Sequence, residues 1–146
     1  MNIRQLMEEL EELRLKSKTA LEESAYLWNH NLEEVEHDSS DPEQQFLMKQ
    51  AGAVMPLLQA AYDRLEYLSL SVEKVGTLHE KGDQLFLDGV HLSCGDMLEI
   101  MDEDEDGNKL WILTHVEADS NGKYYLFGLS NEEQLEGNTC RIRWSY

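Results

Sequence analysis

The sequence is poor in cysteine, proline and basic residues. Its 146 residues include two cysteines and two prolines, and Lys plus Arg number 12 against 30 Asp plus Glu. Two cysteines do not make a disulfide framework. The formal net charge of -18 opposes direct binding to nucleic acid or anionic membranes, because their phosphates would be repelled. We therefore expect a cytoplasmic protein with two free thiols that binds neither class.

Long hydrophobic runs and catalytic motifs are also missing. No apolar run is long enough to span a bilayer, and residues 1–18 are amphipathic and charged, unlike a signal peptide. There is no glycine-rich phosphate loop and no serine or cysteine in a nucleophile elbow. We therefore expect no cofactor and no enzymatic activity. Apolar residues still make up 41% of the chain, enough for a packed core.

The first half of the sequence has the spacing of α-helices. An apolar row beginning at Ile3 and Leu6 predicts a helix over about residues 2–36. After a polar break, Asp41 and Pro42 form a helix start, with Asp41 as the cap and Pro42 in the first turn. A second helix should therefore cover about residues 42–74 and fold back on the first as an antiparallel hairpin, residues 1–75.

A heptad row marks the second helix. It alternates steps of four and three through Leu47, Ala51, Val54, Leu58, Ala61, Leu65, Leu68, Val72 and Val75. Pro56 interrupts the backbone hydrogen bonding, so we predict a kink near it or two helices in line. We expect the row to be core, whereas a face around Tyr26, Trp28, Tyr62 and Tyr67 stays uncovered. Such a face favours a homodimer through the hairpin.

From Gly76 onward the apolar residues alternate with period two. About five strands are expected, over 84–88, 97–101, 110–117, 123–129 and 139–144. Asn121-Gly122 lies between two of them and indicates a tight hairpin. The sequence thus predicts an α+β fold: a long N-terminal antiparallel helical hairpin, then a small antiparallel β-sheet or partly open barrel in residues 76–146.

Five consecutive acidic residues stand out in the second half. They are Asp102, Glu103, Asp104, Glu105 and Asp106, and Gly107 follows them. The run resembles the start of a calcium loop, but Leu113 stands where a bidentate Glu is required. We interpret it as a solvated hairpin tip whose charges resist edge pairing or meet a partner.

Other chemical candidates are weaker. His30, Glu34 and His37 would share a face of the first predicted helix and are the one candidate metal site. His115 and Glu117 share a strand face and form a possible acid–base pair. Arg141 and Arg143 are expected to pair with carboxylates on neighbouring strands.

Residues 76–146 resemble an uncharacterised small β-domain family of Gram-positive bacteria and their phages and conjugative elements. The resemblance lies in the order of Gly76-Thr77-Leu78, Cys94-Gly95-Asp96, Leu98-Glu99, Trp111, His115-Val116-Glu117, Tyr124-Tyr125-Leu126, Leu135-Glu136-Gly137 and Arg141-Ile142-Arg143. These motifs are structural, so the resemblance implies no activity. It does imply a context in which small acidic proteins include anti-CRISPR and anti-restriction inhibitors.

The leading hypothesis is a non-catalytic, acidic protein-binding module. The carboxylates of 102–106 and of Glu8, Glu9, Glu11 and Glu12 would occupy a basic groove that normally holds phosphate, in an enzyme such as Cas9. Two alternatives remain open: a dimeric structural scaffold or adaptor with no nuclease target, and a metal-dependent enzyme using the His30–His37 region.

Overall fold

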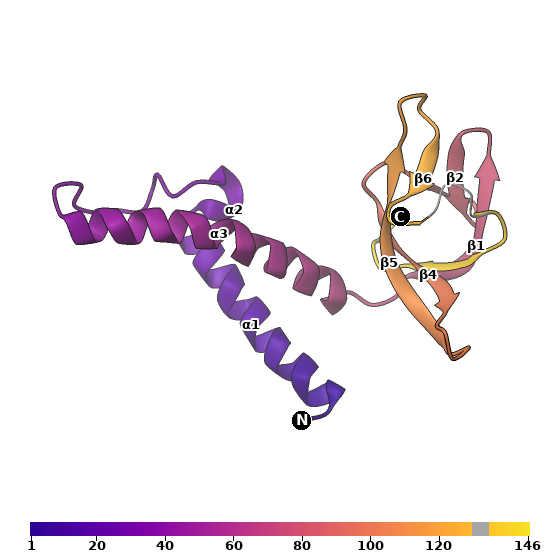
Figure 1. Ribbon diagram of the computed structural model, residues 1–146, viewed down its shortest axis with the longest axis horizontal. Helices are drawn as coiled ribbons and strands as arrows, with labels where there is room; N and C mark the ends of the chain where they lie inside the picture. Colours follow the sequence, from indigo (N-terminus) through magenta and orange to yellow (C-terminus); the bar gives the residue numbers. More distant parts are fainter. Residues whose placement is uncertain (130–134) are drawn as a thin grey trace. The chain divides into compact units, whose positions relative to one another are not determined.

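The computed structural model describes residues 1–129 and 135–146, and it has the α+β fold that the sequence predicts (Figure 1). The chain divides into two compact units, residues 1–70 and residues 71–146. We call them the helical unit and the β domain. Within the described residues, no helix is long and apolar enough to cross a membrane.

The helical unit contains three helices: α1 (Ile3–Glu23), α2 (Tyr26–Asn29) and α3 (Pro42–Ser69). Asn2 caps α1 by accepting a hydrogen bond from the backbone N–H of Gln5, whose side chain in turn accepts one from the N–H of Asn2. Asp41 caps α3 by accepting a hydrogen bond from the backbone N–H of Glu43. The second helix therefore starts where its Asp-Pro sequence predicts.

The prediction of one helix over residues 2–36 was wrong, because the chain breaks twice. Ala25 adopts a left-handed conformation (φ 59°) and His30 does so again (φ 56°), which ends the four-residue α2. The first break directs the Tyr26 side chain into a small core, where it packs with Leu21 and Met55. Burial of that ring outweighs the cost of a non-glycine residue at positive φ, which local sequence does not reveal.

The second helix is shorter than predicted. It ends at Ser69 rather than near 74, because Leu70 is extended (ψ 144°) and Lys74 and Val75 already belong to the sheet. The helix continues through Pro56 as one element, so the alternative of two helices in line was wrong. The predicted kink stays a prediction.

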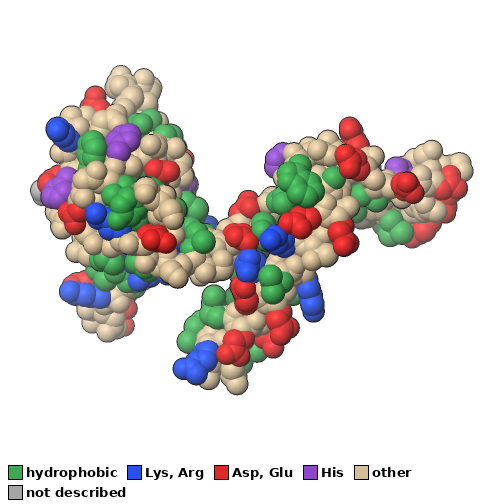
Figure 2. Space-filling model, turned by 180° about the vertical axis from the view of Figure 1, so that it is seen from behind, with side chains coloured by type: hydrophobic (Ala, Val, Ile, Leu, Met, Phe, Trp, Pro, Cys, Tyr) green, Lys and Arg blue, Asp and Glu red, His purple; other side chains and the backbone are tan. Residues whose placement is uncertain are grey.

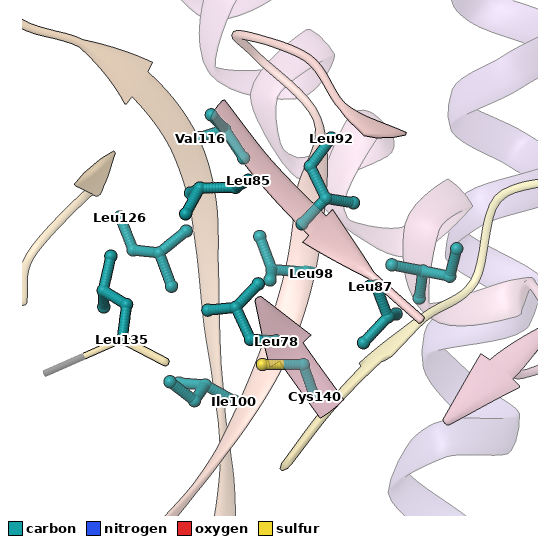
Figure 3. Packing of buried hydrophobic residues seen from close by; sticks show 11 residues of the cluster. Leu78, Leu85, Leu87, Leu92, Leu98, Ile100, Val116, Leu126, Leu135 and Cys140 are labelled. Carbon is teal, nitrogen blue, oxygen red and sulfur yellow. The ribbon is translucent and has the colours of Figure 1, made fainter. Parts of the chain in front are cut away.

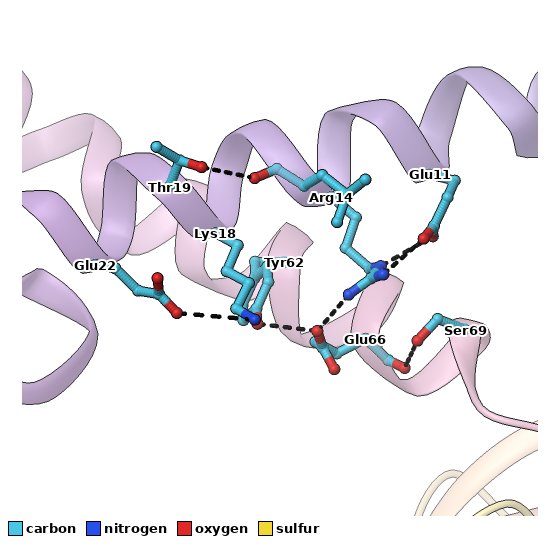
Figure 4. Close-up of polar contacts among 9 residues, drawn as sticks. Glu11, Arg14, Lys18, Thr19, Glu22, Tyr62, Glu66 and Ser69 are labelled. Carbon is cyan, nitrogen blue, oxygen red and sulfur yellow. Dashed lines mark hydrogen bonds and ion pairs between the residues drawn. The ribbon is translucent and has the colours of Figure 1, made fainter.

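α1 and α3 pack antiparallel, as predicted. Arg14 of α1 reaches Glu66 near the end of α3, with Nη1 2.6 Å from Oε1, and the Tyr62 hydroxyl donates to the same oxygen at 2.9 Å (Figure 4). Glu11 holds the other side of the guanidinium at 2.6 Å. These contacts join the middle of α1 to the last turns of α3.

The face of α3 that meets α1 is not the one we expected. Met55 and Tyr62 are buried. Four members of the heptad row that lie seven residues apart in the sequence are exposed: Leu47, Val54, Ala61 and Leu68. Leu47 is 54% exposed and Val54 is 55% exposed. The prediction that Tyr26, Tyr62 and Tyr67 stay uncovered was wrong, since each is 7% exposed, whereas Trp28 is exposed as predicted.

In the described residues the β domain is one seven-stranded sheet, more than the five strands expected. The strands are β1 (Lys74–Lys81), β2 (Gln84–Leu87), β3 (Val90–Leu92), β4 (Met97–Glu103), β5 (Lys109–Ala118), β6 (Tyr124–Leu126) and β7 (Thr139–Ile142). Their order is β3-β2-β1-β7-β4-β5-β6, and every pair is antiparallel. The missed strands are β1, which carries charged and small residues, and the three-residue β3.

One face of the sheet encloses the core of this domain. Its buried residues come from all the strands and from Leu135: Leu78, Leu85, Leu87, Leu92, Leu98, Ile100, Val116, Leu126, Cys140 and Ile142 (Figure 3). The Tyr124 N–H donates to the carbonyl of Asp83 at 3.0 Å, so the edge strand β6 curls toward the turn between β1 and β2. The sheet is thus strongly bent, as a small sheet must be to surround its own core.

Candidate functional site

The acidic run forms the end of a hairpin that extends beyond its neighbour. β4 and β5 pair over seven positions, from Met97 with His115 to Glu103 with Lys109. In contrast, β7 pairs with β4 only at Glu99 and Ile100 within the described residues. Beyond Ile100 the two strands continue as a ribbon, which carries the acidic tip, residues 102–106.

The tip is held by its own backbone hydrogen bonds. The carboxylate of Asp104 accepts from the N–H groups of Asp106 at 2.9 Å and Asn108 at 2.8 Å. Gly107 adopts positive φ (79°), and its N–H donates to the Asp104 carbonyl. Asp104 is therefore needed for the turn, and Asp102 similarly accepts from the N–H of Glu103 at 2.8 Å.

The remaining tip carboxylates are exposed, and none of the described Lys or Arg side chains forms an ion pair with them. Among the described residues, neither Glu105 nor Asp106 forms an ion pair, and Glu103 faces Lys109 across the ribbon without one. A shallow groove of about 380 Å³ adjoins the tip and is lined by Met101, Asp102, Glu103, Lys109, Gly137, Asn138 and Thr139. The arrangement can accept cationic side chains without first breaking ion pairs.

The acidic residues predicted on the first helix lie in the other unit. Glu8, Glu9, Glu11 and Glu12 are all exposed on α1. Glu11 is bound by Arg14, which lowers its pKa mainly through their hydrogen bonds. That carboxylate helps to hold α1 against α3 and is less available to a partner than the other three.

Charge is spread over both units rather than gathered in one place (Figure 2). Residues 1–75 carry 7 basic and 15 acidic side chains, and residues 76–146 carry 5 and 15. The tip differs from the other acidic surfaces in lying on a ribbon and in having carboxylates, at Glu105 and Asp106, that form no ion pair with another described residue.

The structure does not place His30, Glu34 and His37 on one helical face, because no helix covers these residues. His30 ends α2, Glu34 accepts from the side-chain amide of Asn29 at 3.2 Å, and His37 contacts the carbonyl of Val35. In the described part of the chain, no group of three or more His, Cys, Asp or Glu is arranged to hold a metal ion.

His115 and Glu117 do meet, as predicted, at 2.8 Å between Nε2 and Oε1. Phe127 stacks on the imidazole with ring centroids 4.8 Å apart, and the Tyr125 hydroxyl lies 3.5 Å from the other Glu117 oxygen. The structure therefore brings together the imidazole and the carboxylate that the sequence pairs, at a partly exposed position on β5.

The predicted pairing of Arg141 and Arg143 with a carboxylate is confirmed. Both guanidinium groups bind Glu99, at 2.8 Å from Arg141 and 2.9 Å from Arg143, and Glu99 is 6% exposed. Arg141 also lies over the ring of Trp111, 4.2 Å from its centroid. Alternation on β4 and β7 places the three charges on the sheet face away from the core.

Sequence reasoning missed one polar cluster, around His79. Its Nδ1 lies 2.8 Å from Glu136 and its Nε2 lies 3.4 Å from Asp88. The pKa of His79 is raised, first by its hydrogen bond to Glu136 and then by the charges of Glu136 and Asp88, which outweigh desolvation. The partners lie 57 and 9 residues away, and no sequence spacing indicated the meeting.

Comparison with known families gives one match, which lies in the β domain. Residues 76–144 match the family model described as Domain of unknown function (DUF5348). No curated protein and no solved structure gives a significant match. The match supports a small C-terminal domain that is similar to this family of unknown function.

Proposed function

We propose that this protein is a non-catalytic, acidic protein-binding module that acts in the cytoplasm and binds a basic surface of another protein. The observation that carries this proposal is the acidic tip on its ribbon, where Glu105 and Asp106 are exposed and form no ion pair with any other described residue. Charges on a ribbon whose turn is held by hydrogen bonds to Asp104 steer association with a cationic partner, and this preorganisation lowers the entropy cost of binding.

The finer form of the proposal is an inhibitor of a nucleic-acid enzyme. The tip and the free carboxylates of α1 would occupy lysine and arginine positions that normally hold phosphate, as an anti-CRISPR or anti-restriction protein of a mobile element of Gram-positive bacteria would do. The net charge of -18 supports this choice of partner, because it favours cationic grooves and opposes nucleic acid itself.

A tip variant tests the proposal against a basic nuclease such as Cas9. Glu103→Gln, Glu105→Gln and Asp106→Asn together remove three charges and leave Asp104, which holds the turn, in place. The matched control neutralises three exposed residues elsewhere: Glu33→Gln, Glu36→Gln and Glu73→Gln. Because both variants have the same net charge, a non-specific electrostatic effect would weaken them equally.

We expect binding at low salt that weakens at high salt, since ionic attraction is screened. The tip variant should bind about tenfold more weakly than the control variant, the scale of losing a contact charge. Absence of binding at both salt concentrations would overturn the inhibitor proposal. Equal weakening of the two variants would overturn the role of the tip.

A further inference from the structure

The exposed side of α3 forms an apolar stripe that the helical unit leaves uncovered. It runs along one side of the helix through Phe46, Leu47, Val54, Leu57, Ala61 and Leu68. Leu57 is 72% exposed and Phe46 is 55% exposed. In Figure 2, hydrophobic side chains are open at the surface of this unit. We call these six residues the α3 stripe.

The stripe is as long as a helix interface and carries little charge. α3 has 28 residues, or about 42 Å at 1.5 Å per residue. Between residues 44 and 62 its only charged side chain is Lys49, in a chain of net charge -18. Glu43, Asp63, Lys49 and Arg64 nearly cancel outside the α1 contact. Electrostatic repulsion between two copies of this acidic chain is therefore weaker at the α3 stripe than at its acidic surfaces.

The spacing of the stripe is that of a surface that packs on another helix. Leu47, Val54, Ala61 and Leu68 recur every seven residues, which keeps them on one side of a helix that coils around a partner. We propose that the α3 stripe binds the α3 stripe of a second copy, as an antiparallel homodimer with Leu57 next to the two-fold axis.

Charge decides the orientation. The residues just before and at the start of α3 carry six carboxylates and no Lys or Arg: Glu33, Glu34, Glu36, Asp38, Asp41 and Glu43. A parallel pair would bring two such sets together and would also place Arg64 against Arg64. An antiparallel pair centred beside Leu57 separates the sets by the length of the helix, and it places Leu47 near Leu68 and Val54 near Ala61 of the other copy.

The oligomeric state of the full chain tests the dimer directly. Sedimentation equilibrium should give about twice the 16.9 kDa of one chain, falling toward one chain on dilution. Leu57→Glu should weaken association at least tenfold, while Phe127→Glu, at another exposed position in the β domain, should not. Circular dichroism of both variants should match that of the unmodified chain, which would show that they fold. A monomer at every concentration, or equal weakening by both variants, would overturn the proposal.

Cysteine crosslinking tests the orientation in a Cys94→Ser background, because Cys140 is buried. Leu57→Cys alone should form a disulfide-linked dimer on mild oxidation. Leu47→Cys alone should not, but a mixture of Leu47→Cys and Leu68→Cys chains should crosslink to each other. Efficient crosslinking of Leu47→Cys with itself, and none between the mixed chains, would show a parallel pair and overturn the antiparallel arrangement.

Discussion

The two units bury their apolar side chains to different extents. The β domain buries eleven residues in one cluster and encloses them with its own bent sheet. The helical unit buries only Leu21, Tyr26, Met55 and Tyr62 together, and it leaves Leu and Phe side chains open along both long helices. The apolar face that the period-two pattern predicts is covered by the same sheet, whereas much of the face that the heptad pattern predicts is not covered by α1. In the proposed homodimer, the α3 stripe of a second copy would bury this exposed apolar surface.

The largest expected effect comes from the β-domain core. Leu98→Ala removes a fully buried side chain and should lower the free energy of unfolding of this domain by about 3–5 kcal/mol. The same change at Leu57 of α3, measured on dilute monomer, should cost under about 0.5 kcal/mol because that side chain is mostly in water. Urea unfolding measures both. Similar losses at the two positions would contradict the contrast between the units.

The ion cluster on the outer face of the sheet should be the next most sensitive place. Glu99→Gln leaves two guanidinium groups beside a neutral amide and should cost about 2–3 kcal/mol, somewhat below a fully buried pair since Arg141 and Arg143 are partly solvated. Glu117→Gln, at a more exposed pair, is the control and should cost under about 0.5 kcal/mol. Equal thermal stability of the two variants would show that the Glu99 cluster is not structural.

A smaller loss is expected at Gly76 in β1. A Cβ there would overlap the carboxylate of Asp88, which accepts a hydrogen bond from the Thr77 N–H at 3.1 Å. Gly76→Ala should therefore displace Asp88 and cost about 1–2 kcal/mol. Gly82→Ala is a poor control because of its positive φ, so Ala118→Gly serves as an exposed strand comparison. An unchanged or raised melting temperature for Gly76→Ala would contradict the predicted overlap.

The weakest expected effect is a dependence on pH around His79. Its raised pKa means that the folded domain favours the protonated imidazole, held by Glu136 and Asp88. This stabilisation is fully present below the ordinary histidine pKa and is lost as the pH rises through the raised value. Titration by NMR should place the His79 midpoint above its ordinary value, and Glu136→Gln should lower it. A midpoint at or below the ordinary value would contradict the assignment.

Much of the β domain followed from the sequence, because alternation and turn residues are local signals. The β4–β5 hairpin, the acidic tip and the pairing of Arg141 and Arg143 with a carboxylate were all expected from them. β1 escaped prediction since its residues Lys74 to Lys81 include charged and small side chains whose strand state depends on β7 and β2.

The helical unit shows the limit of the same reasoning. A heptad row states that a face prefers another helix, but it does not say which helix. α1 packs instead on the Met55–Tyr62 side of α3, and the break at Ala25 depends on burial of Tyr26, which only the folded chain provides. The metal candidate at His30 failed for this reason, because its geometry presumed a helix that the break removes.

Amide hydrogen exchange of the intact chain, measured at high and low protein concentration, tests the contrast between the two units most directly. The β domain completes its core alone, so its exchange rates should not change with concentration. If the α3 stripe is buried in a homodimer, amides of α3 should exchange faster on dilution, as the dimer dissociates. Exchange from α3 that stays the same at every concentration, with the slow rates of the β core, would contradict the account.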